Sequence, residues 1–273
     1  PLFGREREGG ASLREAASLA KPYNRSFFMI RRKLGALAFW LVVWEACYWA
    51  VGQDLLLASP GQVANYLLHG VNMRFLQCVG MSLARTAAAY VLGVAMGAAL
   101  AVLAKCVPLL RALIQPMLAV IRATPVASFI ILALVWLSAG SVPILTGLLI
   151  VMPVVYANVT EGVDSTDPQL LEMAHMFGWS ETKIWRRVLL PSALPAFLTA
   201  CEACVGMCFK ATIAAEVIGV PRNAMGTQLY NAKVYLETDA LLAWTVVIIA
   251  LSMLTEKLLG LAFERGKKRV HHP

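Results

Sequence analysis

The sequence predicts an all-α, polytopic membrane protein with about six transmembrane helices, and two observations carry this prediction. Hydrophobic residues make up 59% of the chain and charged residues 15%, well below the roughly 25% charged residues of soluble domains. Mostly apolar stretches also approach or reach the length of about 20 residues that a helix needs to cross a bilayer. These stretches lie near residues 34–52, 83–104, 112–138, 142–160, 193–217 and 240–262.

Two of these stretches have internal features of their own. The uncharged segment TAAAYVLGVAMGAALAVLA places Gly93 and Gly97 in a GxxxG spacing, which permits close helix packing but also arises by chance in Ala/Gly-rich helices. The third stretch contains Pro116, Arg122 and Pro125 before the clean run VASFIILALVWLSA. We therefore expect a broken span whose interrupted backbone is covered by neighbouring helices.

The distribution of Lys and Arg predicts that both termini lie in the cytoplasm. With the N-terminus inside, the inner side holds 17 Lys and Arg residues and the outer side four, as the positive-inside rule requires. Residues 1–33 are then a basic cytoplasmic segment that we expect to be disordered, 34–264 the transmembrane domain, and 265–273 a basic cytoplasmic tail. Met29 would make a translation start, in which case residues 1–28 lie outside the native protein.

Other classes of protein receive little support. The net charge is +8, but the basic residues cluster beside apolar runs instead of alternating with aromatics, so nucleic acid is not indicated. Cys201, Cys204 and Cys208 share a helix face without a nearby histidine, which favours small apolar residues over metal ligands. Glu172 and His175 have the Glu-x-x-His spacing of di-iron helices, yet the chain has only four histidines. We predict no catalytic residues and no metal site.

A charged segment, LLEMAHMFGWSETKIWRRVLLPSALP, lies between the fourth and fifth apolar stretches. A helix is expected to begin at Asp167, with a proline in its first turn. Gly178 then interrupts it, and Ser180 is a suitable N-cap for a second helix, ETKIWRRVLL. Prolines at the end of the segment mark the return to the bilayer. We expect a cytoplasmic helix–turn–helix, within a loop at 161–192, that can transmit force from a soluble partner to the fifth span.

This segment resembles the EAA loop of ABC-importer permease subunits, which reads Glu-Ala-Ala, three residues, Gly, nine residues, Ile, one residue and Leu-Pro. Here Glu172-Met173-Ala174 is followed at the same spacing by Gly178, Val188 and Leu190-Pro191. Methionine replaces the middle alanine and valine the isoleucine. The segments LLLASPGQVANYLL, SLARTAAAYVLG, IRATPVASFIILALVWLSAG and KATIAAEVIGV resemble the nitrate/sulfonate/taurine-type branch, with Ala58 in place of a usual proline.

The resemblance implies the permease subunit of an ATP-driven importer in the bacterial cell membrane. Its partners would be a second copy of the chain, two cytoplasmic ATPases and an extracytoplasmic solute-binding protein. ATP and Mg²⁺ would bind to the ATPases, and this chain would bind no cofactor. The solute would be nitrate-, sulfonate- or taurine-like, or a vitamin precursor. The alternative is a secondary transporter driven by an ion gradient, which would need no ATPase.

Two sets of functional residues are predicted. In the coupling loop, the resemblance assigns Glu172 and Ala174 to the docking surface and Gly178 to the turn. Arg186 and Arg187 would contact the ATPase or lipid headgroups, or would serve only as positive-inside anchors. The remaining motif positions are Val188, Leu190 and Pro191. Charged or helix-breaking residues within spans are the candidates for the pathway, and these are Arg122, Pro125, Glu202, Lys210 and Glu216. The charged ones among them would otherwise pair with other spans or snorkel to the interface.

Overall fold

The computed structural model describes residue 32 and residues 35–271, and this part of the chain is helical, without β-strands. The chain divides into two units, residues 1–64 and 65–273, and each is described by itself. The disorder predicted for residues 1–33 lies outside the described residues except at Arg32. The all-α fold class predicted from the sequence is confirmed.

The first unit contains an apolar helix, Gly35–Val51, and the beginning of α2 (Pro60–Gly70), which continues into the second unit. A reciprocal capping box starts α2. The Ser59 N–H donates to Gln62 Oε1 over 2.8 Å, and the Gln62 N–H donates to Ser59 Oγ over 3.1 Å. Two backbone donors that the helix leaves unpaired at its start are thereby satisfied.

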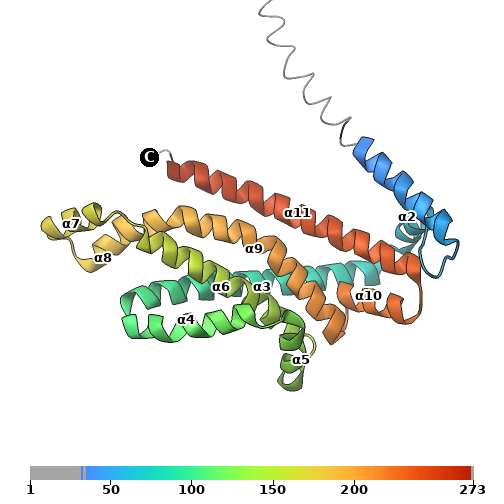
Figure 1. The fold of residues 1–273 in the computed structure, drawn as a ribbon, viewed down its shortest axis with the longest axis horizontal. Helices are drawn as coiled ribbons and strands as arrows, with labels where there is room; N and C mark the ends of the chain where they lie inside the picture. Colours follow the sequence, from blue (N-terminus) through green and yellow to red (C-terminus); the bar gives the residue numbers. More distant parts are fainter. Residues whose placement is uncertain (1–31, 33–34, 272–273) are drawn as a thin grey trace, which may run out of the picture. The chain divides into compact units, whose positions relative to one another are not determined.

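The second unit is built around α6, which packs most extensively against α3 and α9 (Figure 1). Its buried face joins one apolar cluster that reaches from α3 to the start of α9. The helices after α2 are α3 (Met73–Cys106), α4 (Pro108–Ala123), α5 (Val126–Trp136), α6 (Val142–Asp164), α7 (Pro168–Met176), α8 (Glu181–Ile184), the π-helical turn η1 (Trp185–Leu189), α9 (Leu190–Gly219), α10 (Met225–Val234) and α11 (Thr238–His271).

Glycines bring α3 and α6 into close contact. A Cβ atom built on Gly93 would lie 2.7 Å from Val151 Cβ, and one built on Gly97 would lie 2.6 Å from the Met152 carbonyl oxygen. Any side chain at either position would collide with α6, so only glycine permits this approach. The interpretation of the GxxxG spacing as a packing face is confirmed.

Within the described residues, the predicted apolar stretches fall on helices, and the stretch 112–138 is divided between α4 and α5. Four helices are long and apolar enough to cross a membrane, and α4 with α5 forms a fifth span if the two are counted together. The helix Gly35–Val51 is apolar but shorter than a full span. The four long helices are α3, α6, the continuous stretch Glu181–Gly219 and the Thr238–Glu264 part of α11.

The predicted break in the third span is present, but Pro116 does not cause it. The axes of α4 and α5 differ by 106°, and the break falls at Thr124 and Pro125, while Pro116 lies inside α4. A residue before proline is driven out of the helical region, and Thr124 is indeed extended, with φ −74° and ψ 128°. Proline within a membrane helix is tolerated where neighbouring groups satisfy the freed backbone.

Candidate functional site

The short helices α7 and α8 form a hairpin, residues 168–184, at the end of the second unit away from α10 (Figure 1). The Asp167 carboxylate caps α7 by accepting the Gln169 N–H over 2.9 Å. Gly178 has φ +64° and ends the helix. Its N–H donates to the His175 carbonyl over 2.9 Å, and the Trp179 N–H donates to the Ala174 carbonyl over 3.0 Å. This is the Schellman arrangement, so the predicted turn at Gly178 is present.

The hairpin continues into the membrane helix without a break. Ser180 occupies the N-cap position of α8, although its side chain makes no capping hydrogen bond. The sequence placed a boundary at Pro191, but α8, η1 and α9 form one helix from Glu181 to Gly219. A proline ring clashes with the carbonyl four residues earlier in an α-helix. The preceding π-turn, in which the Leu190 N–H donates to the Trp185 carbonyl, is wider and accommodates the ring.

One face of the hairpin is buried against the rest of the second unit. Ala174, Ile184 and Leu189 belong to the same apolar cluster as Val159 and Val163 near the end of α6. Ala174 is only 1% exposed, so its side chain faces the cluster in this structure, and its assignment to the docking surface stays a prediction. Its small side chain lets α7 pack closely against the cluster, and the hairpin is thereby fixed to α6 and α9.

The opposite face of the hairpin is exposed and carries an apolar tip that sequence analysis overlooked. Met176 is 88% exposed and Phe177 is 72% exposed, and both immediately precede the turn glycine. Met173 is exposed as well. Large apolar side chains beside a helix-ending glycine, in a segment that is otherwise polar, were the available signal. We call Met173, Met176 and Phe177 the apolar tip.

The other motif residues lie on α7 and on the helix that follows the turn. Glu172, Arg186 and Arg187 are exposed, and their contact with a partner or with lipid headgroups stays a prediction. Val188 is half-buried and Leu190 exposed. Lys183 places its Nζ 4.3 Å from the centre of the Trp179 ring, a cation–π contact that braces the turn.

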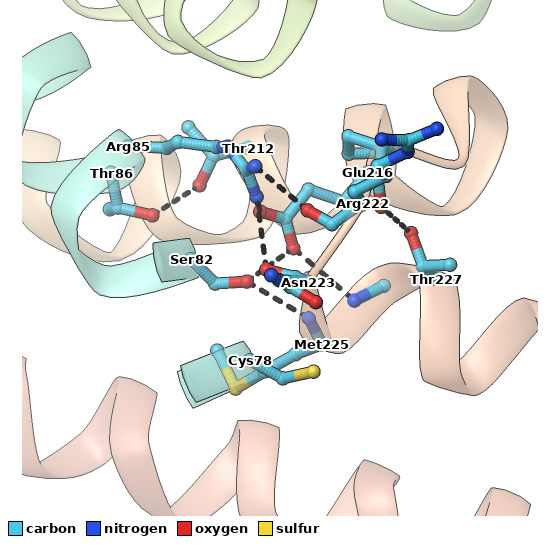
Figure 2. Close-up of polar contacts among 12 residues, drawn as sticks. Cys78, Ser82, Arg85, Thr86, Thr212, Glu216, Arg222, Asn223, Met225 and Thr227 are labelled. Atoms are coloured by element: carbon cyan, nitrogen blue, oxygen red, sulfur yellow. Dashed lines mark hydrogen bonds and ion pairs between the residues drawn. The ribbon is translucent and has the colours of Figure 1, made fainter. Parts of the chain in front are cut away.

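At the α10 end of the second unit, Glu216 lies in a buried polar cluster (Figure 2). Its side chain is fully buried, and Oε1 forms an ion pair with Arg85 Nη1 at 3.2 Å. Its Oε2 accepts the Ser82 hydroxyl over 2.6 Å and the Gly226 N–H over 3.2 Å. The carboxylate is therefore closed off in this structure, whereas the sequence suggested a pathway or gate residue at the outer end of the span.

Arg85 extends the cluster into the loop between α9 and α10. Its guanidinium donates to the carbonyl oxygens of Arg222 over 3.0 Å and Asn223 over 3.4 Å, while the Met225 N–H donates to Ser82 Oγ over 2.9 Å. Asn223 has φ +50°, a conformation that Asn adopts more readily than most residues. The cluster thus ties α3, α9 and this loop together. Ser82 and Arg85 were not predicted as site residues, because the sequence alone does not reveal their distant partner.

The five predicted pathway residues are not brought together into one cluster. Arg122 is exposed on α4 and Pro125 is the N-cap of α5, whereas Glu216 is buried between α3 and α9. Glu202 is half-buried on α9, and its Oε1 lies 3.7 Å from the position that a Cβ atom on Gly260 would occupy. Lys210 is exposed on α9 and has no hydrogen-bond or ion-pair partner within the described part of the chain.

Within the described residues, no group of three His, Cys, Asp or Glu side chains is placed to hold a metal ion. Cys201, Cys204 and Cys208 are buried as free thiols, and Cys204 and Cys208 lie in the apolar cluster around α6. His175 is 3.5 Å from Glu181 on the exposed side of the hairpin. These side chains contribute packing and surface charge to the fold.

Comparison with known proteins places this architecture in a family. Residues 89–265 match the family model described as binding-protein-dependent transport system inner membrane component. The taurine transport system permease protein TauC of Escherichia coli (strain K12) is 29% identical over 235 residues, which is 82% of this chain and 84% of TauC. The formylaminopyrimidine transport permease protein ThiX of Halalkalibacterium halodurans is 25% identical over 181 residues, covering 66% of this chain and 72% of ThiX.

A solved structure shows the same fold. The crystal structure of an amino acid ABC transporter with histidines contains a chain that superposes with a TM-score of 0.59 at 21% identity. The match covers 70% of this chain and 94% of the other. The polytopic helical architecture, the matched family model and the fold agree with the EAA-like spacing of the hairpin. The chain therefore belongs to the family of inner membrane components of binding-protein-dependent transport systems and is the non-catalytic permease subunit of an ABC importer.

Proposed function

We propose that the α7–α8 hairpin is the surface on which a separate ATPase subunit docks. The observation that carries this proposal is the apolar tip exposed on α7, a short helix that lies outside the long membrane helices. Apolar side chains exposed to water at such a position favour burial against a partner. Glu172, Arg186 and Arg187 are exposed as well and would supply polar contacts to the same partner.

The hairpin is connected to the membrane helices in a way that would transmit movement to them. Its inner face is anchored by Ala174 and Ile184 in the cluster around α6, and its second helix is continuous with α9 as far as Gly219. A displacement of the tip would therefore move α9 rather than bend a flexible linker. ATP and Mg²⁺ would be bound by the ATPase, with none bound by this chain, and two states of the ATPase pair would favour two arrangements of the permease.

The assembly follows from the same proposal. The hairpin and both termini would face the cytoplasm, and the α10 end would face the solute-binding protein on the other side of the plasma membrane. Two copies of the chain would enclose the pathway between them. Lys210 supports this arrangement, because an exposed lysine on a membrane helix is costly in lipid and is expected to face water or a partner.

The transported solute is proposed to be a small organic molecule with a sulfonate or similar anionic group. This proposal rests on the similarity to the taurine permease over most of both chains. The exposed cations Arg122 and Lys210, which have no ion-pair partner among the described residues, could meet such a group. An ion-coupled secondary transporter is not favoured, since it would give the exposed tip of the hairpin no partner.

The docking proposal is tested by replacing Phe177 and, separately, Met176 with alanine. We expect each variant to bind the ATPase subunit at least tenfold more weakly, which corresponds to about 1.4 kcal/mol, with an unchanged melting temperature of the permease. Affinity is measured between the purified permease in nanodiscs and the ATPase. Tyr235→Ala is the matched control, because Tyr235 is 71% exposed next to α10. ATPase binding that is unchanged in both hairpin variants would remove the tip from the interface.

A further inference from the structure

A groove with a volume of about 440 Å³ runs between α4 and α6. The two helices are antiparallel there, because Arg111 near the start of α4 forms an ion pair with Asp164 at the end of α6, at 2.7 Å. Asp164 is also paired with Lys105 at 2.8 Å. The groove is thus held at one end by this three-residue ionic cluster, and it extends toward the break between α4 and α5. Its lining comprises Arg111, Gln115, Arg122, Tyr156, Ala157, Thr160, Glu161, Asp164 and Ser165.

The helix α4 turns a polar face to this groove. Arg111, Gln115 and Arg122 follow one another at spacings of four and seven residues, which places them on one side of the helix. Leu109 and Leu113 are exposed on the opposite side, as is suitable for lipid or a second subunit. The polar stripe spans roughly 16 Å along the helix at 1.5 Å per residue, and such a stripe within a membrane span indicates a water-filled path.

Two hydroxyl groups in the groove have no partner within the described residues. Tyr156 Oη and Thr160 Oγ1 are buried, and neither forms a hydrogen bond there. A buried polar atom left without a hydrogen bond costs about 1–3 kcal/mol. Such atoms are expected to be satisfied by a bound molecule or by water, and the residues that carry them, Tyr156 and Thr160, line the groove on the α6 side while the hydroxyl oxygens themselves lie beneath its surface.

Opposite charges are also available in the groove. Arg122 and Glu161 both line it, and neither side chain has an ion-pair partner in the described part of the chain. Because the helices are antiparallel, Arg122 lies toward Tyr156. Glu161 lies one and a half turns beyond Tyr156 on α6, or roughly 7 Å along the helix axis. The groove therefore offers a cationic and hydroxyl-bearing part and, separately, a carboxylate.

We propose that this groove is a binding station for a small zwitterion on the translocation path. Its anionic group would bind to Arg122 and its ammonium group to Glu161, with water linking the buried Tyr156 and Thr160 hydroxyls to the bound molecule. A simple anion would leave Glu161 unpaired and repelled, and a simple amine would do the same to Arg122. The inference rests on the proposed function, since it narrows the solute class to molecules that carry both charges.

The test measures protection of a cysteine placed in the groove, so it does not depend on transport or on ATPase binding. The full chain carries Ala157→Cys and Cys106→Ser and is reconstituted in phosphatidylcholine nanodiscs. The exposed Cys47 is kept as an internal reference. Labelling of each thiol by a maleimide is followed by mass spectrometry, with and without taurine, ethanesulfonate or ethylamine at equal concentration. Ser165→Cys provides a second reporter in case the first variant fails to fold.

We expect taurine to slow labelling in the groove at least threefold and more than either singly charged compound, with labelling of Cys47 unchanged. Glu161→Gln should remove the preference for taurine over ethanesulfonate. Arg122→Gln should abolish protection by both sulfonates. The matched controls are Glu237→Gln and Arg74→Gln, which change exposed charges outside the groove.

Two results would overturn the proposal. One is equal protection by all three compounds, or protection by none. The other is protection by phosphatidylglycerol added to the nanodiscs in the absence of any effect of taurine, which would make the groove a lipid-headgroup site. If the docking proposal failed instead, the ATPase would not bind to the hairpin while taurine still protected the groove. The two failures are therefore distinguishable.

Discussion

At the α10 end of the second unit, single residues determine how the buried charges are paired. Glu216 is fully buried, and its carboxylate is satisfied by Arg85, by Ser82 and by the backbone of the loop after α9. A buried ion pair of this kind costs desolvation energy, but once formed it is expensive to break, because either partner alone is an uncompensated charge. The pair therefore fixes which parts of α3 and α9 lie together.

Replacing Glu216 with glutamine should destabilise the folded permease by about 3 kcal/mol, because Arg85 keeps its charge in a buried site and loses its counter-ion. The measurement is the unfolding free energy of the purified chain in detergent. Glu237→Gln, at an exposed carboxylate between α10 and α11, is the control and should change stability by less than about 0.5 kcal/mol. A loss no larger than that of the control would show that the pair adds nothing to stability.

Gly178 gives a second prediction at this scale. A Cβ there would meet no atom within 4 Å, so the cost of substitution comes from its φ of +64° alone. Gly178→Val should destabilise the hairpin by about 1–2 kcal/mol, and Gly178→Asn by less, because Asn visits the left-handed region. Hydrogen exchange at the Trp179 amide reports the local loss, and more ATP hydrolysed per solute imported reports uncoupling. Identical behaviour of the two variants would contradict the conformational explanation.

Among the elements, the crossing of α3 and α6 depends on backbone contact rather than on side-chain fit. Gly93 and Gly97 leave no room for a methyl group where they meet α6. A GxxxG spacing also arises by chance in an Ala/Gly-rich helix. Only the position of α6 shows that these two glycines form a packing face. This crossing holds α3 against α6, the helix around which the second unit is built.

Alanine at Gly97 should therefore cost about 1–3 kcal/mol, the usual range for overpacking. Gly80 lies in the same helix, and a Cβ added to it would have no atom within 4 Å, so Gly80→Ala is a matched control. That change should be neutral or should stabilise the helix by up to about 1 kcal/mol. Melting of the two purified variants in the same detergent compares them. A melting temperature that rises equally in both would mean that helix propensity, not the crossing, sets the result.

Local elements were predictable from the sequence where the deciding interactions are local. The start of α7 at Asp167, the turn at Gly178 and the break before α5 follow from capping and backbone rules that act over a few residues. The continuation of the helix through Pro191 did not follow, because a π-turn is a response of the backbone to the ring and leaves little signal in the sequence. The burial of Ala174 was not predicted either, since a motif does not reveal which face of a helix is covered.

For the whole molecule, apolar length and composition predicted the all-α membrane fold, although four or five helices rather than six are long enough to span a membrane among the described residues. The long-range contacts could not be predicted. Glu216 and Arg85 are 131 residues apart, and nothing in the sequence around either residue indicates that the other is its partner. The groove between α4 and α6 likewise depends on the pairing of Arg111 with Asp164. The distribution of Lys and Arg, by contrast, predicts the orientation of the chain in the membrane, and this prediction can be tested directly.

If the hairpin faces the cytoplasm, a cysteine at position 180 should be labelled by a membrane-impermeant maleimide only in inverted vesicles. A cysteine at position 237, beyond α10, should be labelled in intact spheroplasts. Ser180→Cys and Glu237→Cys both alter exposed residues, so each variant should keep the fold of the parent chain. The two variants should differ only in the side of the membrane from which the new thiol reacts. The reverse pattern would invert the topology, and labelling of both from one side would require a different number of spans.

The π-turn at Trp185–Leu189 has a geometric consequence for the hairpin. A π-turn holds one residue more than an α-helical turn, and each residue of an α-helix advances the chain by about 100° around the axis. Winding this turn into regular α-helix without deleting a residue would swing the hairpin by about that angle relative to α9. The azimuth at which the hairpin meets its partner is therefore set by five residues, and the long membrane helix beyond them need not rotate for that azimuth to change.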